Sequence, residues 1–270
     1  MKTSARTTYT TMADNLTTKP IGFVVYEGPS ELDGSPIVVI VNRILTASDN
    51  VKTGDIVQSF IIRSDVSPMD ALRSGADVAV CGDCEHRPSL VKAGNGKAPC
   101  YVNVGRSVMS VYGAYKRGSY VKASPDDVAK LLGGRVLRLG TYGDPFAAPL
   151  AVWLPMVHAS ARRVGYTHQW QNPKFDAAAW GPLVMASADT VAQRTMANAM
   201  GLRTFRVGFA DELLKVMGEA VCPASAEAGR KTTCADCRLC GGTSIKANDI
   251  VIRDHAVGFK GRTVFAIATA

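Results

Sequence analysis

The stretch "SPDDVAKLLGGRVLRLGTYGDP", residues 124–145, predicts a short helix followed by a buried strand. The Ser124 hydroxyl can cap the helix, Pro125 suits the first helical position, and Gly133 is a typical stop. Two aspartates in the first turn favour the positive end of the helix dipole. A helix that leads directly into an apolar strand is one unit of a parallel α/β fold.

The same alternation continues toward the C-terminus. Segments typical of helices and strands follow in turn: "APLAVWLPMVHASARR" (a helix kinked at Pro155), "VGYTHQW" and "PLVMASAD" (strands), "TVAQRTMANAMG" (helix) and "LRTFRVGF" (strand). Residues 66–221 are therefore expected to form an α/β core that also carries the first cysteines. The pattern fits either part of a (β/α) barrel or an open doubly wound sheet.

The chain before this core is β-rich. Residues 20–65 contain "IGFVVYE", "PIVVIVNRIL" and "DIVQSFIIR", with the polar turn "DNVKTGD" between the last two. Residues 1–65 form an N-terminal segment that either shares the core's sheet or stands apart. The polar lead-in lacks the apolar region of a secretory signal, and the chain has no apolar run of about 18 residues. We expect a cytoplasmic protein, where disulfides are disfavoured.

Polar side chains follow several of the expected strands. In parallel sheets, ligands gather at the carboxyl ends of the strands, so Asp144, His168, Asp189 and Arg206 are candidate catalytic residues. The unperturbed pKa of histidine lies near neutrality, so His168 suits acid–base work, whereas Asp189 and Arg206 would orient a substrate. Each also has an ordinary alternative: Asp144 as a turn residue and Asp189 as a helix cap.

Four cysteines lie near the C-terminus, in the segment 222–270. Their spacing is Cys222-x11-Cys234-x2-Cys237-x2-Cys240. Two-residue gaps let neighbouring thiolates converge on one centre, and four thiolates can hold a 4Fe-4S iron–sulfur cluster or a zinc ion. Three cysteines at this rhythm favour iron–sulfur over zinc.

The residues around these thiols are basic. Arg230, Lys231 and Arg238 lie beside or between them, and cations lower the pKa of a thiol. His255 is a candidate substitute ligand, although an ordinary loop histidine fits equally.

A first cysteine group has the spacing Cys81-x2-Cys84-x15-Cys100. Three thiolates on a cluster leave one iron open to a ligand, which would make the site reactive. With His86 as a fourth ligand, the same group becomes a closed zinc site. The third alternative is three free, buried cysteines.

The chain is basic, with a formal net charge of +8 and an isoelectric point near 9.2. Such a balance attracts polyanions. In "AYKRGSY", Tyr115 and Tyr120 flank Lys116 and Arg117, which favours a DNA-binding or nucleotide-binding role but also fits an ordinary helix end. The sequence contains neither a GxSxG elbow nor a GxxxxGK[ST] loop, which argues against a serine hydrolase and an NTPase.

An ordered set of short motifs resembles an uncharacterised bacteriophage family, the one named after a mycobacteriophage gene product, number eighty-eight. The resemblance covers about residues 42–255 and rests on "NVKTGD", "CGDCEHR", "CYVNVG", "RLGTYGDP", "GYTHQW", "VMASAD", "TFRV" and "CPAS…CADCRLC". It implies a phage or prophage origin in a bacterial host. It implies no activity.

The cysteine division also resembles the radical S-adenosylmethionine (radical SAM) enzymes. Their partial barrels begin with a three-cysteine cluster whose open iron binds the cofactor, and many carry an auxiliary cluster. The resemblance gives Cys81, Cys84 and Cys100 the first role and the four C-terminal cysteines the second. It places Tyr142, Gly143 and Asp144 at the cofactor-binding loop. The first spacing is wider than the compact one of that superfamily.

These features together predict an iron–sulfur enzyme of radical-SAM-like type, acting on nucleic acid or a nucleotide-related substrate. The expected fold is a partial (β/α) barrel with a β-rich N-terminal segment and a cysteine-rich C-terminal segment. The alternative is a nucleic-acid-binding protein of phage replication or DNA processing with structural zinc or iron–sulfur sites.

Overall fold

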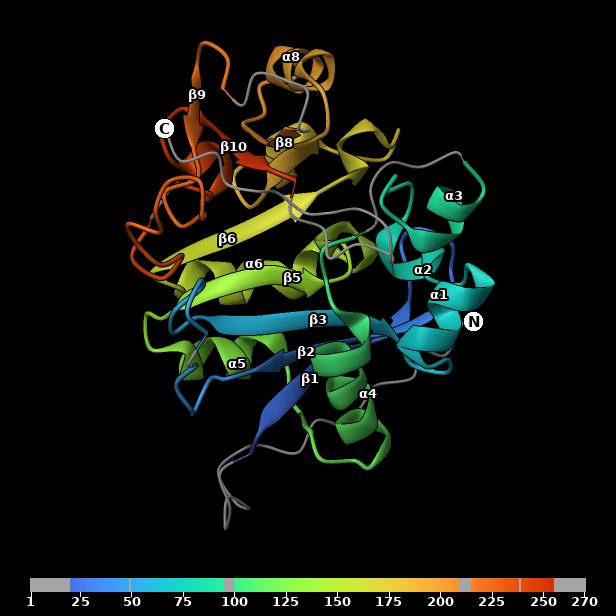
Figure 1. Cartoon of the computed structure of the whole chain (residues 1–270). Helices are drawn as coiled ribbons and strands as arrows, with labels where there is room; N and C mark the ends of the chain where they lie inside the picture. Colours follow the sequence, from blue (N-terminus) through green and yellow to red (C-terminus); the bar gives the residue numbers. More distant parts are fainter. Residues whose placement is uncertain (1–19, 49, 95–99, 209–214, 238, 255–270) are drawn as a thin grey trace, which may run out of the picture.

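A computed structural model of the chain describes residues 20–48, 50–94, 100–208, 215–237 and 239–254. Its centre is one sheet with the strand order β4-β1-β2-β3-β5-β6-β7-β8-β10-β9 (Figure 1). The strands are β1 (Gly22–Pro29), β2 (Pro36–Asn42), β3 (Val57–Arg63), β4 (Val121–Lys122), β5 (Val136–Tyr142), β6 (Arg162–Thr167), β7 (Met185–Ala188), β8 (Thr204–Gly208), β9 (Glu219–Val221) and β10 (Asp249–Arg253).

The sheet is mostly parallel. β2 runs antiparallel to both of its neighbours, β1 and β3, and every other pairing is parallel. The N-terminal strands therefore belong to the same sheet as the core. β2 is buried over residues 37–41, as expected of an apolar strand covered on both faces.

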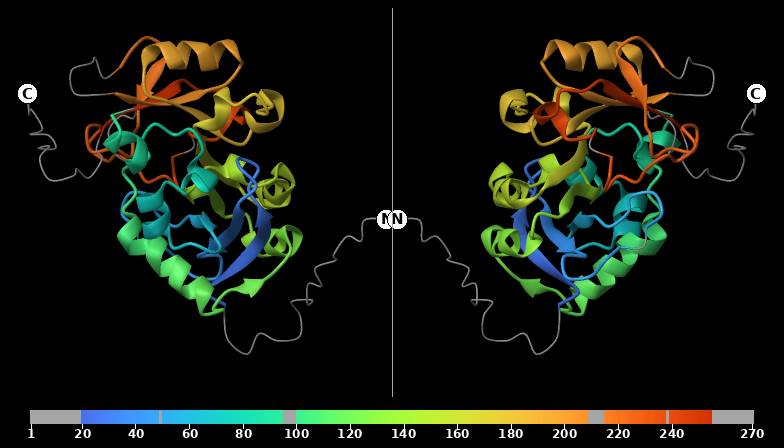
Figure 2. Two further views of the ribbon diagram at one scale, coloured as in Figure 1. Left: turned by 90° about the vertical axis from the view of Figure 1, so that its right-hand side faces the viewer. Right: turned by 90° about the vertical axis from the view of Figure 1, so that its left-hand side faces the viewer.

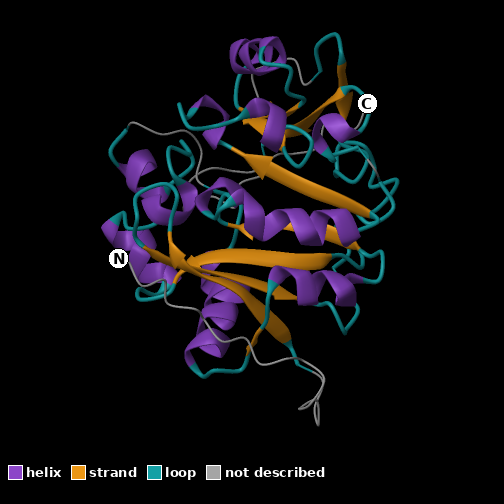
Figure 3. Ribbon diagram, turned by 180° about the vertical axis from the view of Figure 1, so that it is seen from behind, coloured by secondary structure: helices purple, strands orange, loops and turns teal. Residues whose placement is uncertain are grey.

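Helices lie on both faces of this sheet. α1 to α4 lie on one side, and α5 to α7 lie on the other (Figure 2). Seen from behind, α5 and α6 lie over the face of the sheet that is turned toward the viewer (Figure 3). The helices are α1 (Pro68–Ser74), α2 (Val78–Cys81), α3 (Pro88–Lys92), α4 (Met109–Lys116), α5 (Pro125–Leu132), α6 (Leu150–Ala159), α7 (Ala177–Trp180) and α8 (Val191–Ala199). Short 3-10 turns lie at Pro145–Ala147, Gln169–Gln171 and Gly242–Ser244, and a π turn at Val104–Val108 precedes α4.

The predicted helix–strand unit is confirmed. The Ser124 hydroxyl accepts a hydrogen bond from the Asp127 amide at 3.1 Å and caps α5. Gly133 follows the helix with a φ of 55°, in the left-handed region where glycine carries no steric penalty. β5 then begins at Val136.

The order of the central strands bears on the α/β architecture. β3, β5, β6, β7 and β8 are neighbours in the order in which the chain makes them, and β4 and β9 form the two edges. A doubly wound sheet reverses its strand order at a switch point. The central part of this open sheet instead winds in one direction.

The two faces of β5 have different surroundings. Leu137 and Leu139 are fully buried in the main core, together with residues of α5 and α6. Arg138, Gly140 and Tyr142 alternate with them and line a cavity on the opposite face. No helix in the described part of the chain is long and apolar enough to cross a membrane.

Candidate metal centres and cavity

All seven cysteines line one cavity of about 240 Å³, and none of them forms a disulfide. The floor of the cavity comes from alternate residues of the parallel strands, which point to the same face: Arg138 and Gly140 of β5, Val164 and Tyr166 of β6, Phe205 and Val207 of β8, Ile250 and Ile252 of β10. The structure thus brings together two cysteine groups that lie far apart in the sequence.

The first group, Cys81, Cys84 and Cys100, is fixed by a buried ion pair. The Arg87 guanidinium donates through Nε and Nη2 to the two carboxylate oxygens of Asp77, at 3.1 and 2.9 Å. Its remaining donors reach the carbonyls of residues 75 and 82, so that one side chain ties together the turn between Cys81 and Cys84. A bidentate pair of this kind is specific in geometry as well as strong.

The turn between Cys81 and Cys84 also contacts the carboxyl ends of the strands. The Asp144 amide donates to the Val80 carbonyl at 2.6 Å, and the Gln169 side-chain amide donates to the Cys81 carbonyl at 3.2 Å. Gly82 has a φ of 54°, and a Cβ there would lie 2.5 Å from Cδ of Gln169. Glycine is therefore required at this approach.

The thiols of the first group are half-buried beside one another. Burial raises the pKa of Cys81 and Cys84, and the neighbouring thiols raise both values further. Amide groups oppose this effect, because the His86 amide donates to the Cys84 sulfur and the Val102 amide donates to the Cys100 sulfur at 3.5 Å. Such N–H donors stabilise the thiolate form and tune metal centres held by sulfur.

The second group, Cys222, Cys234, Cys237 and Cys240, contacts both β10 and the turn between β2 and β3. The Cys222 amide donates to the Val251 carbonyl at 2.8 Å. The Cys234 amide donates to the Lys52 carbonyl at 3.1 Å, and the next amide donates to the carbonyl of residue 53 at 2.8 Å. The "NVKTGD" turn thus holds the C-terminal cysteine loop through backbone hydrogen bonds.

The second group is embedded in an apolar cluster. Cys222 and Cys240 are buried with Ile56, Val164 and Ile250. Burial raises the pKa of Cys240, and the Tyr166 hydroxyl, which donates to the sulfur, opposes this rise. The net pKa is about 12. A metal cation would stabilise these thiolates where water cannot.

The cations that act on these thiols differ from the expected ones. Burial raises the pKa of Cys222 and that of Cys234; Lys52 opposes this rise at both thiols, and Arg138 opposes it at Cys234. Arg230 and Lys231 are exposed. Arg238 and His255 lie outside the described residues.

The spacing of the sulfurs bears on the kind of centre. A tetrahedral zinc ion with Zn–S bonds of about 2.3 Å holds its sulfurs about 3.8 Å apart. Among the described residues, no three cysteine sulfurs lie within 4.8 Å of one another. His86 likewise groups with no pair of thiols at that distance, so the Cys3His arrangement is not preformed.

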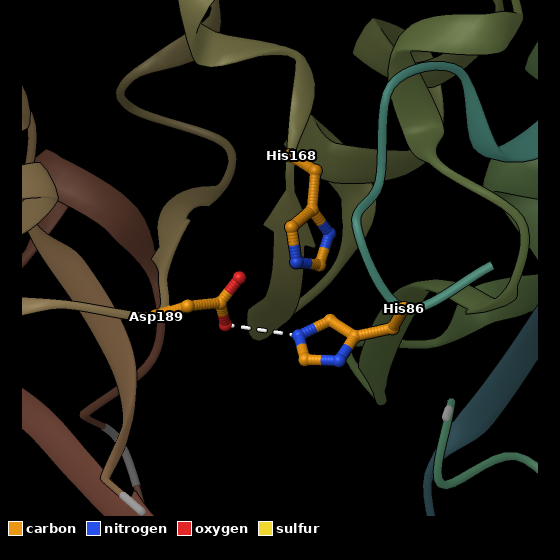
Figure 4. A group of neighbouring side chains, drawn as sticks. All are labelled: His86, His168 and Asp189. Carbon is orange, nitrogen blue, oxygen red and sulfur yellow. Dashed lines mark hydrogen bonds and ion pairs between the residues drawn. The ribbon is translucent and has the colours of Figure 1, made fainter. Parts of the chain in front are cut away.

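His86, His168 and Asp189 do form a compact group, and their ligand atoms all lie within 4.8 Å (Figure 4). His86 Nε2 and Asp189 Oδ1 are 2.9 Å apart, and the two imidazole rings meet edge to face with centroids 5.6 Å apart. His168 and Asp189 directly follow β6 and β7, which is where the strand-end argument places them. His86 joins them from the first cysteine turn.

Asp144 lies at the cavity, and its carboxylate also has the turn role that the sequence offered as the alternative. Its carboxylate accepts hydrogen bonds from the Phe146 amide at 3.0 Å, the Thr167 hydroxyl at 2.8 Å and the His168 amide at 2.8 Å. Burial raises the pKa of this carboxyl and the hydrogen-bond donors oppose the rise, so that the net pKa is about 6. The carboxylate borders the cavity, but its oxygens hold the end of β6 and fix the backbone of His168.

The position of Arg206 differs from the prediction that this residue orients a substrate. The guanidinium is fully buried and pairs with Glu219 of β9, with Nε–Oε1 and Nη2–Oε2 distances of 2.7 and 2.9 Å. It joins β8 to β9 and does not line the cavity, because its position in β8 points away from Phe205 and Val207. Asp189 is likewise not the cap of α8, because Thr190 accepts the hydrogen bond from the Gln193 amide.

The loop Tyr142–Asp144 lies at the cavity, as the sequence suggested. The Tyr142 hydroxyl is buried, with no hydrogen-bond partner among the described residues. Gly143 has a φ of 82°, and a Cβ there would lie 2.6 Å from the Ile61 carbonyl oxygen. The loop therefore packs tightly on β3 while it turns a phenol toward the thiols.

The "AYKRGSY" segment is the end of α4. The Tyr115 hydroxyl donates to Glu27 at 2.5 Å, and the Lys116 ammonium lies 5.9 Å from the centroid of the Tyr112 ring. The Tyr120 side chain is half-buried and bonds to Asn42. These aromatic rings serve the fold, which favours the ordinary helix-end interpretation over base stacking.

Comparison of the chain with family models, with curated proteins and with solved structures finds no match. The resemblances to the phage family and to radical SAM enzymes therefore remain expectations from the sequence.

Proposed function

We propose that the protein is an iron–sulfur enzyme in which Cys81, Cys84 and Cys100 hold a reactive cluster. In this proposal the four C-terminal cysteines hold an auxiliary one. The supporting observation is that seven thiols, divided three and four between two distant segments, line one cavity. Cofactor-free thiols buried in this way are held in their protonated form, and clustered thiolates are stabilised by a metal centre.

The donor set fits iron–sulfur clusters better than single zinc ions. No three of the described sulfurs lie within 4.8 Å of one another, as the ligands of one zinc ion would, and a cluster of several iron and sulfide ions fills a wider space. Amide donors to sulfur and the Tyr166 hydroxyl beside Cys240 add the hydrogen bonds that tune such centres.

The two clusters would supply one-electron chemistry, and the chain's own residues would prepare the cavity for it. The aliphatic side chains of β6, β8 and β10 exclude water from the floor. Lys52 and Arg138 place positive charge there, which suits a small ligand with a carboxylate or phosphate. The Tyr142 hydroxyl, which has no hydrogen-bond partner among the described residues, offers a donor close to the first cysteine group.

The one-directional strand order supports a radical-SAM-like partial barrel as the finer description of the fold. We infer that S-adenosylmethionine is a ligand of the three-cysteine centre and that a nucleotide-related molecule is the substrate. A phage origin and a place in the bacterial cytoplasm belong to the same proposal.

Anaerobic purification with iron and sulfide analysis tests the proposal. We expect iron and sulfide sufficient for two clusters. The double variant Cys81→Ser/Cys84→Ser should lose only the first cluster, and Cys234→Ser/Cys237→Ser only the second, so each variant is the control for the other. A colourless protein that contains zinc alone, in the wild type, would eliminate the proposal.

S-adenosylmethionine is tested separately, by equilibrium dialysis against the anaerobic protein. We expect one bound molecule in the wild type and none in the Cys81→Ser/Cys84→Ser variant. Binding that survives this variant would contradict the role of the open centre.

A further inference from the structure

The group of His86, His168 and Asp189 has the composition of a metal site of another kind. It offers two imidazole nitrogens and one carboxylate oxygen, from three separate segments of the chain. Two histidines and one carboxylate on one face of an ion form a known binding pattern for divalent transition metals such as Fe²⁺. These harder ligands differ from the thiols next to them.

The distances suit an ion. Two ligand atoms that bind at about 2.1 Å and at right angles are about 3.0 Å apart. The separation of 2.9 Å between His86 Nε2 and Asp189 Oδ1 is close to this value, and the His168 ligand atom lies within 4.8 Å of both. Figure 4 shows one ring nitrogen of each histidine turned toward the Asp189 carboxylate.

The backbone of each ligand is held in place. The His168 amide donates to Asp144 at 2.8 Å, and the Asp189 amide donates to the Gln193 side chain at 2.7 Å. The His86 amide donates to the Cys84 sulfur. Preorganised ligands of this kind keep a site in shape before the ion arrives.

Burial adds a charge argument. The Asp189 side chain is 3% exposed and that of His86 is 13% exposed. A buried carboxylate is costly unless a positive charge accompanies it. His86 and His168 both line the cavity, so the remaining positions of an ion bound here would open toward it.

We propose that His86, His168 and Asp189 bind one divalent transition-metal ion at the mouth of the cavity, separate from the cysteine centres. The ion would act as a Lewis acid or hold a ligand molecule against the first cysteine group. This inference is independent of the proposed iron–sulfur chemistry, because its ligands contain no sulfur.

Mn²⁺ is a suitable probe, because it prefers oxygen and nitrogen ligands to thiolates. We expect the full-length protein to bind one Mn²⁺ per chain, seen as loss of the free-ion electron paramagnetic resonance signal. His168→Ala and Asp189→Asn should each weaken binding by at least about 100-fold, since even indirect partners of metal ligands cost about 10–100-fold. His168→Ala keeps the amide that bonds Asp144, and Asp189→Asn is close in shape, so both should fold.

His158→Ala is the matched control, because His158 is exposed on α6 and should leave Mn²⁺ affinity unchanged. Cys234→Ser/Cys237→Ser should also leave it unchanged, which separates this site from the second cysteine group. Failure to bind Mn²⁺ at millimolar concentration would overturn the proposal and leave Asp189 and His86 as a proton-transfer pair. Binding that ignores the His168 and Asp189 variants would overturn it too, by placing the ion elsewhere.

Discussion

The two cysteine groups share one cavity but lie in different surroundings. Cys81, Cys84 and Cys100 lie at the carboxyl ends of the strands, beside Asp144, His168 and Asp189. Three of the four C-terminal cysteines, Cys222, Cys234 and Cys240, pack with aliphatic side chains such as Ile56 and Ile250. Thiols in a polar rim suit a centre that reacts, and thiols in an apolar wall suit a centre that only passes electrons or holds the fold.

The ways in which the groups are fixed differ as well. A buried ion pair between Arg87 and Asp77 fixes the first group. Backbone hydrogen bonds to the Lys52 turn fix the second. The first group should therefore lose its arrangement when one charge of the ion pair is removed. The second group should instead depend on the conformation of the Lys52 turn.

Arg87→Met should have the largest effect. It leaves the Asp77 carboxylate buried without its partner, which costs about 3–5 kcal/mol in the free energy of unfolding. Urea denaturation measures this loss. Arg73→Met is the matched control, because Arg73 pairs with Asp70 on the surface and should change stability by less than about 1 kcal/mol. Equal effects of the two variants would contradict the role of the buried ion pair in fixing the first group.

Asp144 should make stability depend on pH. Its folded pKa of about 6 lies above the ordinary value of 3.8, so the folded chain binds this proton more tightly than the unfolded chain. The contribution is fully present below about pH 4 and is lost as the pH rises through about 6, with a total of about 3 kcal/mol.

Asp144→Asn isolates this contribution, because it removes the titrating group. The stability of the wild type relative to Asp144→Asn should fall by up to about 3 kcal/mol between about pH 4 and pH 7. Urea unfolding of both proteins across this range gives the difference directly. A difference that stays constant would mean that the polar rim does not hold Asp144 as described.

Two glycine substitutions have the smallest expected effects on stability, and they compare the two cysteine groups directly. Gly82→Ala places a Cβ 2.5 Å from Cδ of Gln169, which must move and release the Cys81 carbonyl. We expect a loss of about 2 kcal/mol in unfolding free energy. Gly54→Ala meets Oγ1 of Thr233 at 2.8 Å, a milder contact, and should cost about 1 kcal/mol.

The melting temperature of each glycine variant measures this difference, and iron analysis shows which cysteine group is affected. Under the proposed iron–sulfur assignment, Gly82→Ala should lower the iron held by the first group, and Gly54→Ala that held by the second. The reverse assignment would contradict the contacts described for the two turns.

Much of the fold could be predicted from the sequence because its signals are local. The Ser124 cap, the Gly133 stop and the apolar alternation predicted α5 and β5 correctly. The strand-end rule brought His168 and Asp189 to one rim without any knowledge of their partner. β9 and β10 were missed, because three- and five-residue strands inside a cysteine-rich segment have little periodicity.

The errors concern contacts between distant residues. Arg206 looked like a ligand for phosphate because nothing local to it suggests Glu219, which belongs to another strand. Arg230 and Lys231 looked like the cations of the second group, whereas Lys52 comes from a turn far back in the sequence. The joining of His86 to His168 depends in the same way on where the Arg87 clamp places its turn.

The hydrogen bond between the Cys234 amide and the Lys52 carbonyl implies an order in which the two cysteine groups form during protein synthesis. Every contact described for the first cysteine group is made within residues 75–189, so that group can close before the C-terminal cysteines have been synthesised. The second group joins the Lys52 turn to the segment that starts at Cys222, so it can close only after both of these segments have been made.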